Sequence, residues 1–278
     1  MLIQRILTSF ALLFVVLAAV FFLPPGYFYL FIGLVIGISI WEWSALAGFV
    51  KTPSRITCLL ILAGFMWISL HAPVPIEIFF ITGIVFWIVA FLYVCNYSGK
   101  QSEHDYKVAL FLVALPLFIP GWMAFVWLRE QQYFAFHLLS LFALVASADI
   151  GAFFAGKAFG RHKLAENVSP NKTWEGFCGG IIASAFVITL ASFIFISRVS
   201  EISVMKWLLL VACAMLVAAS SAVGDLFESL VKRFRNVKDS GTILPGHGGI
   251  LDRIDGLTAA APVYAMLLVL LDSQFLSI

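Results

Sequence analysis

Charge is the scarcest property of this 278-residue chain. Only 12% of its residues are Asp, Glu, Lys or Arg, whereas soluble domains carry about 25%. The four cysteines are far apart and include no Cys-x-x-Cys pair. These shortages exclude an ordinary soluble enzyme and a secreted domain stapled by disulfides. A hydrophobic content of 62%, with 28 Phe and 8 Trp, also excludes a disordered chain.

Long apolar runs fill most of the sequence instead. A membrane-spanning helix needs about 20 apolar residues, and nine stretches approach that length. They lie near 6–23, 27–49, 57–72, 77–95, 108–128, 134–156, 177–197, 206–230 and 257–277. The first run has no small-residue cleavage site after it, so we interpret it as a retained helix rather than a signal peptide. The predicted fold is therefore all-α, in an integral membrane protein with about nine transmembrane helices.

The basic residues predict the orientation of these helices. Of the 17 Lys and Arg residues, only Arg129, Arg198 and Lys206 fall on one side of the alternating loops. Lys and Arg accumulate in cytoplasmic loops, so the richer side is predicted to be cytoplasmic. The N-terminus then lies in the cytoplasm and the C-terminus outside. The membrane is expected to be the bacterial inner membrane.

Polar residues crowd into two of the predicted cytoplasmic segments, 156–176 and 231–256. The first hundred residues are mostly plain spans joined by short loops. We therefore predict a scaffold of transmembrane helices over residues 1–130 and a region that carries the chemistry over 131–278. Both are expected to belong to one continuous membrane domain.

The first polar segment contains Ser169–Thr173, which reads S-P-N-K-T. Pro fixes φ and Asn tolerates unusual backbone angles, so these residues are predicted to form a turn. Backbone N–H groups in such a turn, beside a helix start, can cradle a phosphate, and Lys172 adds a positive charge. An ordinary basic loop that ends in a helix cap is the alternative.

The second polar segment combines a glycine-rich turn with interleaved charges. Pro245–Gly249, which reads P-G-H-G-G, predicts a tight, exposed backbone that a ligand can approach closely. Asp252 and Asp255 follow within one turn of the last predicted helix. Lys and Arg beside carboxylates are typical of a site for polyphosphate and a divalent cation. A solvated charged loop is the alternative.

Three acidic residues fall inside predicted transmembrane helices: Asp149, Asp225 and Glu228. An unpaired acid at the centre of a span costs about 2.5–3.5 kcal/mol, so such residues usually mark a functional site. All three are placed near cytoplasmic helix ends, which predicts a cation site in a polar cavity that faces the cytoplasm. Isolated acids satisfied by Ser or backbone groups are the alternative. Glu42, between two tryptophans, is interpreted as a structural hydrogen-bond partner.

These motifs carry a family resemblance. Residues 229–255 read S-L-V-K-R-F-R-N-V-K-D-S-G-T-I-L-P-G-H-G-G-I-L-D-R-I-D and resemble the signature of the phosphatidate cytidylyltransferase family. Upstream, Asp149 and the segment 156–176 are similar to a second block of that family. The resemblance covers the C-terminal half closely, whereas the N-terminal half is similar mainly in hydropathy and length.

The resemblance implies a reaction, its substrates and its cofactors. CTP and phosphatidic acid would give CDP-diacylglycerol and pyrophosphate, with Mg²⁺ and a second cation of unknown identity. The partners implied are CTP, phosphatidic acid and membrane lipid, with no nucleic acid, and the chain is expected to form a homodimer. A lipid phosphate is already anionic near neutral pH, so the reaction needs no strong general base. Positioning and electrostatics would supply most of the catalysis.

Residue roles follow as hypotheses. Asp225 and Asp252 are expected to bind the metal, with Asp255 and Asp149 as further ligands. The residues expected to act in catalysis are Asp225, Asp252, Lys232, Arg233, Lys238 and Asp255. The residues expected to bind substrate are Ser169, Pro170, Asn171, Lys172, Asp239, His247, Gly248, Gly249 and Arg253. His247 can equally stabilise the turn, and Arg253 can orient an aspartate.

Three other functions compete with this hypothesis. A coupled membrane transporter also carries acids inside its spans, but broken helices near mid-membrane would be expected. A non-catalytic scaffold explains neither the glycine turn nor the acids. A CDP-alcohol phosphotransferase is disfavoured because Asp255–Gly256 is followed by Leu-Thr-Ala-Ala with no Arg.

Overall fold

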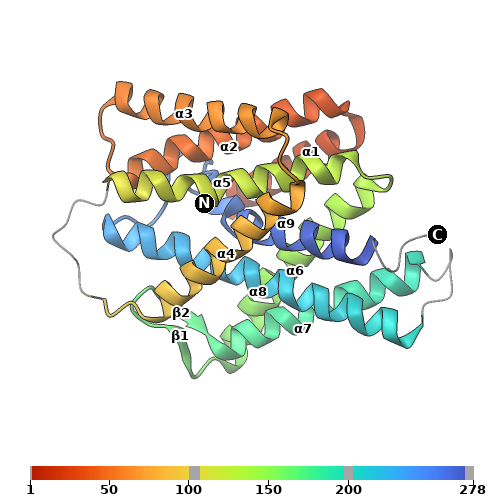
Figure 1. Cartoon of the computed structure of the whole chain (residues 1–278). Coiled ribbons are helices and arrows are strands. Elements are labelled where there is room, and N and C mark those ends of the chain that lie inside the picture. The colour runs from red at the N-terminus through yellow and green to blue at the C-terminus, as the bar shows by residue number, and fades with distance from the viewer. Residues whose placement is uncertain (1, 100–106, 197–202, 273–278) are drawn as a thin grey trace.

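A computed structural model describes residues 2–99, 107–196 and 203–272 (Figure 1). Over these residues the chain forms nine α-helices, one π-helical turn and one short β-hairpin. The helices are α1 (Leu2–Phe22), α2 (Pro25–Ala47), α3 (Thr52–His71), α4 (Ile76–Cys95), α5 (Lys107–Glu130), α6 (Phe134–Phe159), α7 (Trp174–Ala191), α8 (Val204–Phe234) and α9 (Leu251–Asp272). The hairpin pairs β1 (Lys163–Ala165) with β2 (Ser169–Thr173), and the π-turn η1 spans Ser192–Ile196.

Length and composition identify eight of the described helices as able to cross a membrane. The apolar part of α1, Ile6–Phe22, is shorter than the other eight. Large apolar side chains such as Phe14, Leu60, Trp67 and Phe193 are exposed on the outside of the bundle. A soluble monomer rarely exposes so much apolar surface, whereas lipid contact requires it. The protein is therefore an all-α, polytopic integral membrane protein, as the sequence predicts.

Two helices extend beyond the apolar runs that predict them. Helix α9 begins at Leu251 rather than near 257, so Asp252 and Asp255 lie in its first turns. Helix α8 continues to Phe234 and carries Lys232 and Arg233 in its last turn. A helix satisfies its own backbone hydrogen bonds whether its side chains are apolar or polar. Hydropathy therefore locates the lipid-crossing part of a helix, not the polar turns that continue it.

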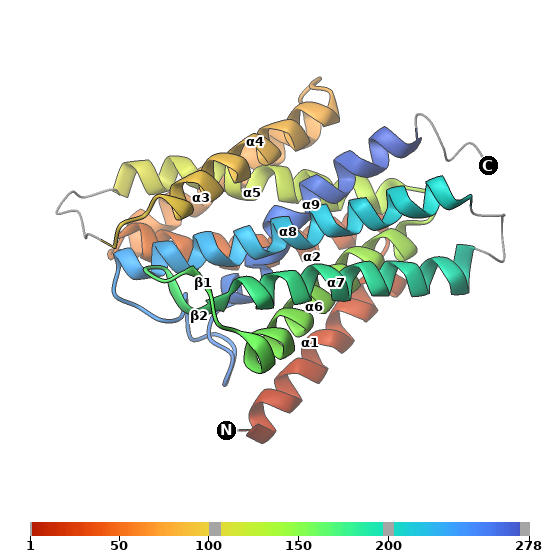
Figure 2. The same cartoon turned by 90° about the horizontal axis from the view of Figure 1, so that it is seen from below.

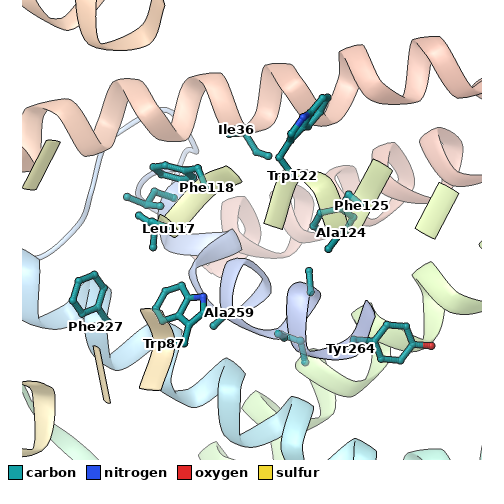
Figure 3. Packing of buried hydrophobic residues seen from close by; sticks show 14 of the residues in the cluster. Ile36, Trp87, Leu117, Phe118, Trp122, Ala124, Phe125, Phe227, Ala259 and Tyr264 are labelled. Carbon is teal, nitrogen blue, oxygen red and sulfur yellow. The ribbon is translucent and has the colours of Figure 1, made fainter. Parts of the chain in front are cut away.

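Helix α9 packs against α2, α4, α5, α6 and α8 near the middle of the bundle, and α6 lies along α7 (Figures 1 and 2). Aromatic side chains fill the space between them (Figure 3). The Trp87 ring meets the Phe227 ring edge-on, with centroids 5.9 Å apart. Trp43 stacks on Phe227 from the other side, and its Nε1 donates to the Leu110 carbonyl at 2.9 Å. The polar edge of the largest buried side chain is thus satisfied inside the apolar core.

Three described segments that the basic residues assign to one membrane face lie at one end of the bundle: the α2–α3 loop, the hairpin and the loop between α8 and α9 (Figure 2). Arg235, after α8, donates to the Leu46 and Ala47 carbonyls at the end of α2. Arg233 Nε donates to the Val168 carbonyl in the hairpin at 3.0 Å. The predicted alternation of the loops therefore agrees with the packing of these helix ends.

The close approach of α6 to α7 depends on glycine. A Cβ atom on Gly179 would overlap Ala155 Cβ, and one on Gly180 would lie 2.6 Å from the Ala148 carbonyl oxygen. Neither neighbour is the end of a flexible side chain, so the helices themselves would have to separate.

We expect Gly179→Ala to destabilise the folded protein by about 1–3 kcal/mol, the usual cost of overpacking. Gly64→Ala is the matched control, because a Cβ atom at Gly64 meets nothing within 4 Å. Thermal unfolding in detergent should give a lower midpoint for the first variant and an unchanged or higher one for the second. Equal midpoints would contradict a glycine-dependent contact.

Candidate active site

A cavity of about 610 Å³ opens among α6, α7, α8 and β2. Its charged and polar lining comes from Asp149, Lys157, Lys172 and Asp225, with Ser169 and Asn171 from the hairpin. Its other walls are apolar or small, including Phe153, Phe177 and Ile181. Glycines of the α6–α7 contact also line this space, namely Gly156, Gly176 and Gly180, together with Ala218 and Ala222 of α8. Small side chains therefore leave room for a ligand at the end of a tightly packed helix pair.

The hairpin corrects one prediction. Ser169, Pro170, Asn171, Lys172 and Thr173 do not form a turn but the strand β2, paired in antiparallel fashion with β1. The turn lies just before them, at residues 166–168. Pro170 is tolerated because this two-stranded sheet has open edges, where a missing N–H breaks no ladder. A local turn signal from Pro and Asn was outweighed by pairing with residues that lie only a few positions earlier.

The hairpin still delivers its polar residues to the cavity. Thr173 caps α7 by accepting from Gly176 N at 3.1 Å, which fixes where β2 ends and the helix begins. Ser169, Asn171 and Lys172 line the cavity. The predicted cradle of turn N–H groups is therefore replaced by polar side chains of a strand beside the start of α7.

Lys172 reaches across the cavity to α8. Its Nζ lies 2.6 Å from Asp225 Oδ2, and the two side chains remain 24% and 39% exposed. Asp149 faces the same pair from α6, within electrostatic range of both charges. The cavity therefore places the positive charge of Lys172 near two carboxylates, and the Lys172–Asp225 pair is open to solvent in part.

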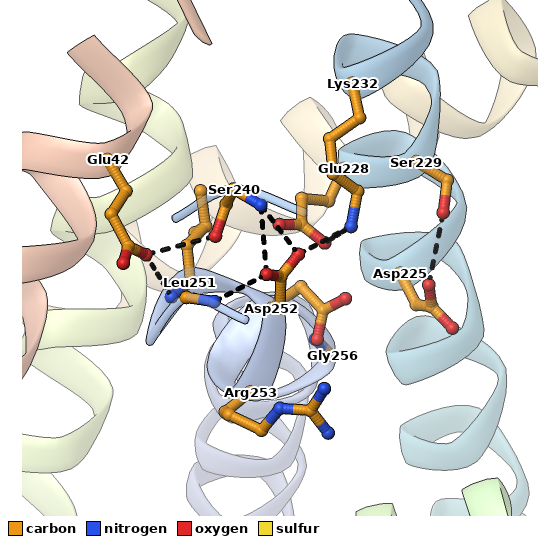
Figure 4. Close-up of polar contacts among 12 residues, drawn as sticks. Glu42, Asp225, Glu228, Ser229, Lys232, Ser240, Leu251, Asp252, Arg253 and Gly256 are labelled. Carbon is orange, nitrogen blue, oxygen red and sulfur yellow. Dashed lines mark hydrogen bonds and ion pairs between the residues drawn. The ribbon is translucent and has the colours of Figure 1, made fainter. Parts of the chain in front are cut away.

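A second ion cluster joins α8 to α9 (Figure 4). Lys232 Nζ lies 2.7 Å from Glu228 Oε2 and 2.7 Å from Asp252 Oδ1. These side chains are nearly buried, at 12%, 4% and 6% exposure in that order. The ammonium group is thus committed to two carboxylates, which leaves it poorly placed for the predicted contact with phosphate.

Asp252 also organises the loop before α9. Its carboxylate accepts from Ser240 N at 2.9 Å and from Gly249 N at 2.8 Å. Gly248, at φ 83°, turns the chain back so that Leu244 and Gly248 form an isolated bridge. The predicted tight glycine turn is therefore present, and Asp252 ties both of its flanks to the helix start.

Negative charge exceeds positive charge between α8 and α9. Asp255 lies beside Glu228, whose Oε1 is buried with no hydrogen-bond donor among the described residues. In the described part of the chain, no three His, Cys, Asp or Glu side chains gather closely enough to hold a metal ion alone. Mg²⁺ typically takes one or two carboxylates and fills its other positions with water and substrate phosphates. These hard oxygen donors, with an orphaned acceptor, fit that requirement.

Of the remaining predicted site residues, two make contacts at the glycine turn and two are exposed. Arg253 Nη2 donates to the His247 carbonyl at 3.1 Å, and His247 Nε2 lies 3.3 Å from Ser9 Oγ. Both contacts stabilise the glycine turn, the alternative that the sequence left open for His247. Lys238 and Asp239 are exposed on the loop before the turn.

Sequence reasoning missed the part that α1 takes in this site. Thr8 Oγ1 donates to the Pro245 carbonyl at 3.1 Å, beside the contact of Ser9 with His247. Both hydroxyls sit in an otherwise apolar run, and no local pattern relates them to a turn far along the chain.

Comparison with known proteins gives this arrangement a family. The sequence model of the cytidylyltransferase family matches residues 3–271. The chain belongs to the cytidylyltransferase family. It is similar to the phosphatidate cytidylyltransferase of Pseudomonas aeruginosa, at 40% identity over 268 residues, covering 96% of this chain and 97% of that protein. The corresponding protein of Haemophilus influenzae is 37% identical over 289 residues, with coverage of 95% and 98%. That of Thermotoga maritima is 34% identical over 190 residues, with coverage of 68% and 67%.

The ion cluster between α8 and α9 of this cytidylyltransferase should contribute to its stability. Lys232→Met leaves Glu228 and Asp252 as adjacent buried carboxylates, and breaking a buried pair from one side costs about 3–5 kcal/mol. Lys238→Met is the matched control, because an exposed side chain changes stability by about 0.5 kcal/mol or less. Denaturant unfolding in detergent measures both. If the two variants unfold alike, Lys232 does not hold α8 to α9.

Proposed function

We propose that the protein transfers the cytidylyl group of CTP to phosphatidic acid, leaving CDP-diacylglycerol in the membrane and releasing pyrophosphate. The observation that carries this proposal is the cavity, which combines the Lys172–Asp225 pair with apolar helix walls. The family match and the names of the full-length relatives support the same reaction.

The two kinds of wall suit the two substrates. The lipid phosphate is placed at Lys172, with its acyl chains along Phe153, Phe177 and Ile181, which line the same cavity. The nucleotide reaches the site from the loop side, where Arg233 and Lys238 are exposed. The positive charges of these two side chains attract the triphosphate of CTP from solution. This arrangement lets a membrane-bound nucleophile and a soluble nucleotide meet at one helix end.

The chemistry is displacement at phosphorus. An oxygen of the lipid phosphate bonds to the α-phosphorus of CTP, the α–β anhydride bond breaks, and its electron pair leaves with pyrophosphate. The second pKa of a phosphomonoester is near 6, so the nucleophile is anionic near neutral pH and needs no base from the protein. The main obstacle is repulsion between anions, which fixed positive charges reduce.

Magnesium fits the oxygen donors of the site. Asp225, Asp252 and Asp255 would hold it, with Asp149 and the orphaned Glu228 oxygen nearby, and a second cation has the same donors at hand. When bound, Mg²⁺ draws charge from phosphate oxygens and aligns them for displacement. Lys172, which pairs with Asp225 at the cavity, would bind the lipid phosphate. Lys232 keeps Glu228 and Asp252 together, and we assign it positioning rather than phosphate binding.

The coupled transporter considered from sequence is not favoured. The family match covers almost the whole chain. The hairpin and the loop between α8 and α9, which contains the glycine turn, also lie at one end of the bundle, as a site open to one membrane face requires (Figure 2).

The placement in the cell follows from the same reasoning. We propose that the protein lies in a bacterial inner membrane, with its N-terminus and active site on the cytoplasmic side and its C-terminus outside. The relatives from Pseudomonas aeruginosa and Haemophilus influenzae are bacterial proteins, and CTP is a cytosolic nucleotide. A homodimer remains our expectation from the family resemblance.

The reaction predicts where labelled phosphorus goes. Purified protein, phosphatidic acid and Mg²⁺ are incubated with CTP labelled either at the α- or at the γ-phosphorus. The α label should enter the lipid extract and the γ label should appear in pyrophosphate. A γ label in the lipid would indicate a kinase instead, and no label in lipid from either CTP would reject the proposal.

Asp225 provides a test of the site itself. Asp225→Asn removes the charge that faces Lys172, and we expect turnover to fall by about a hundredfold or more, as when other preorganised charges are lost. The folded yield should hold, because this pair is partly exposed and such pairs add little stability. Glu77→Gln, at the start of α4, is the matched carboxyl-to-amide control. Near-normal turnover of Asp225→Asn would remove this residue from the catalytic machinery.

A further inference from the structure

Glu42 on α2 is a buried carboxylate that touches the loop before α9. It is only 2% exposed. Its Oε1 accepts from Ile250 N at 3.1 Å, and its Oε2 accepts from Leu251 N at 2.8 Å and from Ser240 Oγ at 3.1 Å (Figure 4). Three donors from one loop therefore converge on a side chain that lies about two hundred residues earlier in the sequence.

The loop closes on this carboxylate with no spare room. A Cβ atom on Gly241 or on Gly249 would overlap Glu42 oxygens. The loop backbone is thus in close contact with the carboxylate, and a Cβ atom at either position would displace the Glu42 side chain. Such close contact between the loop backbone and the Glu42 carboxylate is more than packing alone would need.

The same loop residues also bind Asp252. Ser240 donates its hydroxyl to Glu42 and its backbone N–H to Asp252. Gly249 N goes to Asp252, while the next two N–H groups go to Glu42. The two carboxylates share one backbone turn, so a shift at Glu42 must be transmitted to Asp252 and to the start of α9.

Two positive electrostatic contributions act on the Glu42 carboxylate. The N–H groups of residues 250 and 251 form the N-terminal end of α9, where the helix dipole favours an anion. Arg55 adds attraction from α3 while its own hydrogen bonds go to Ser44 and the Trp41 carbonyl. The Glu42 carboxylate is therefore attracted both to the N-terminal end of α9 and to the Arg55 guanidinium group.

We propose that Glu42 is a positioning residue for cytidylyl transfer: through Ser240 and the start of α9, it fixes where Asp252 and Asp255 stand. The inference rests on the proposed function for its kinetic test. Glu42 does not line the cavity, so it acts through other residues rather than on the substrate.

Glu42→Gln is the sharpest substitution because it keeps the volume and removes one acceptor. If the amide nitrogen takes the Oε1 place, it faces the N–H of Ile250. If it takes the Oε2 place, it faces the N–H of Leu251. Either way two donors oppose each other, and the loop must move away. We expect kcat to fall tenfold or more while the KM for phosphatidic acid stays within about threefold.

Glu130→Gln, at the opposite end of the bundle beside Tyr29, is the matched control and should leave both constants unchanged. Ser240→Ala removes only the hydroxyl donor and should lower kcat less than Glu42→Gln does. It carries the kinetic test if Glu42→Gln fails to fold. The double variant should be no slower than Glu42→Gln alone, because both changes act on one turn. Wild-type kcat in the single variants, or a rise in KM equal to the fall in kcat, would overturn the proposal.

Hydrogen exchange separates this inference from the proposed function. Backbone amides of residues 240–251 should exchange faster in Glu42→Gln, or in Ser240→Ala, than in the wild type, with Glu130→Gln unchanged. This readout needs no turnover, so it tests the loop contact even if the wild type makes no lipid product. Unchanged exchange in folded variants would show that Glu42 does not position the loop.

Discussion

A single buried ammonium group joins the acidic side chains of α8 and α9. Lys232 lies between Glu228 and Asp252, at 2.7 Å from each, where little water reaches any of the three. Without this group the adjoining helix ends would present carboxylates to each other in a weakly screened environment, which costs several kcal/mol. The positive charge does not balance the region, because Asp255 stands beside the same acids. Lys232 thus holds α8 to α9, and the carboxylates between these helices still outnumber it. The excess negative charge attracts cations.

A cavity lies next to these acids, and small residues on the surrounding helices make room for it. A lipid phosphate can therefore approach the charged groups. Glycine brings α6 against α7 and leaves space toward α8. The hairpin then adds Lys172, which lines the cavity and pairs with Asp225. Apolar walls and a charged end in one cavity solve a specific physical problem. A phosphate held at the membrane surface meets a soluble polyanion without either leaving its preferred medium.

Hydropathy and loop charge predicted the helices, because each span must satisfy its own backbone and bury apolar side chains in lipid. The glycine turn and the structural role of Glu42 were also predictable, since positive-φ glycines and a lone acid between tryptophans carry local signals. The β2 strand was not, because pairing with β1 outweighed the turn preference of Pro170 and Asn171. Nor was the engagement of Lys232, since a sequence does not say which of several basic residues meets which acid. A short hairpin decided the first, and a contact between α8 and α9 decided the second.

Contacts between distant segments also give the N-terminal half a role beyond that of a scaffold. From sequence, residues 1–130 were a scaffold, with the chemistry assigned to residues 131–278. Yet the end of α2 holds Glu42 against the start of α9, while Arg235 caps α2 from the far side of the same loop. Trp43, the next residue, packs on Phe227 of α8. One short stretch of α2 therefore contacts the helices on both sides of the loop between α8 and α9. Because a displacement of about 1 Å at reacting groups is enough to slow catalysis strongly, a scaffold that fixes this loop contributes to the rate without touching substrate.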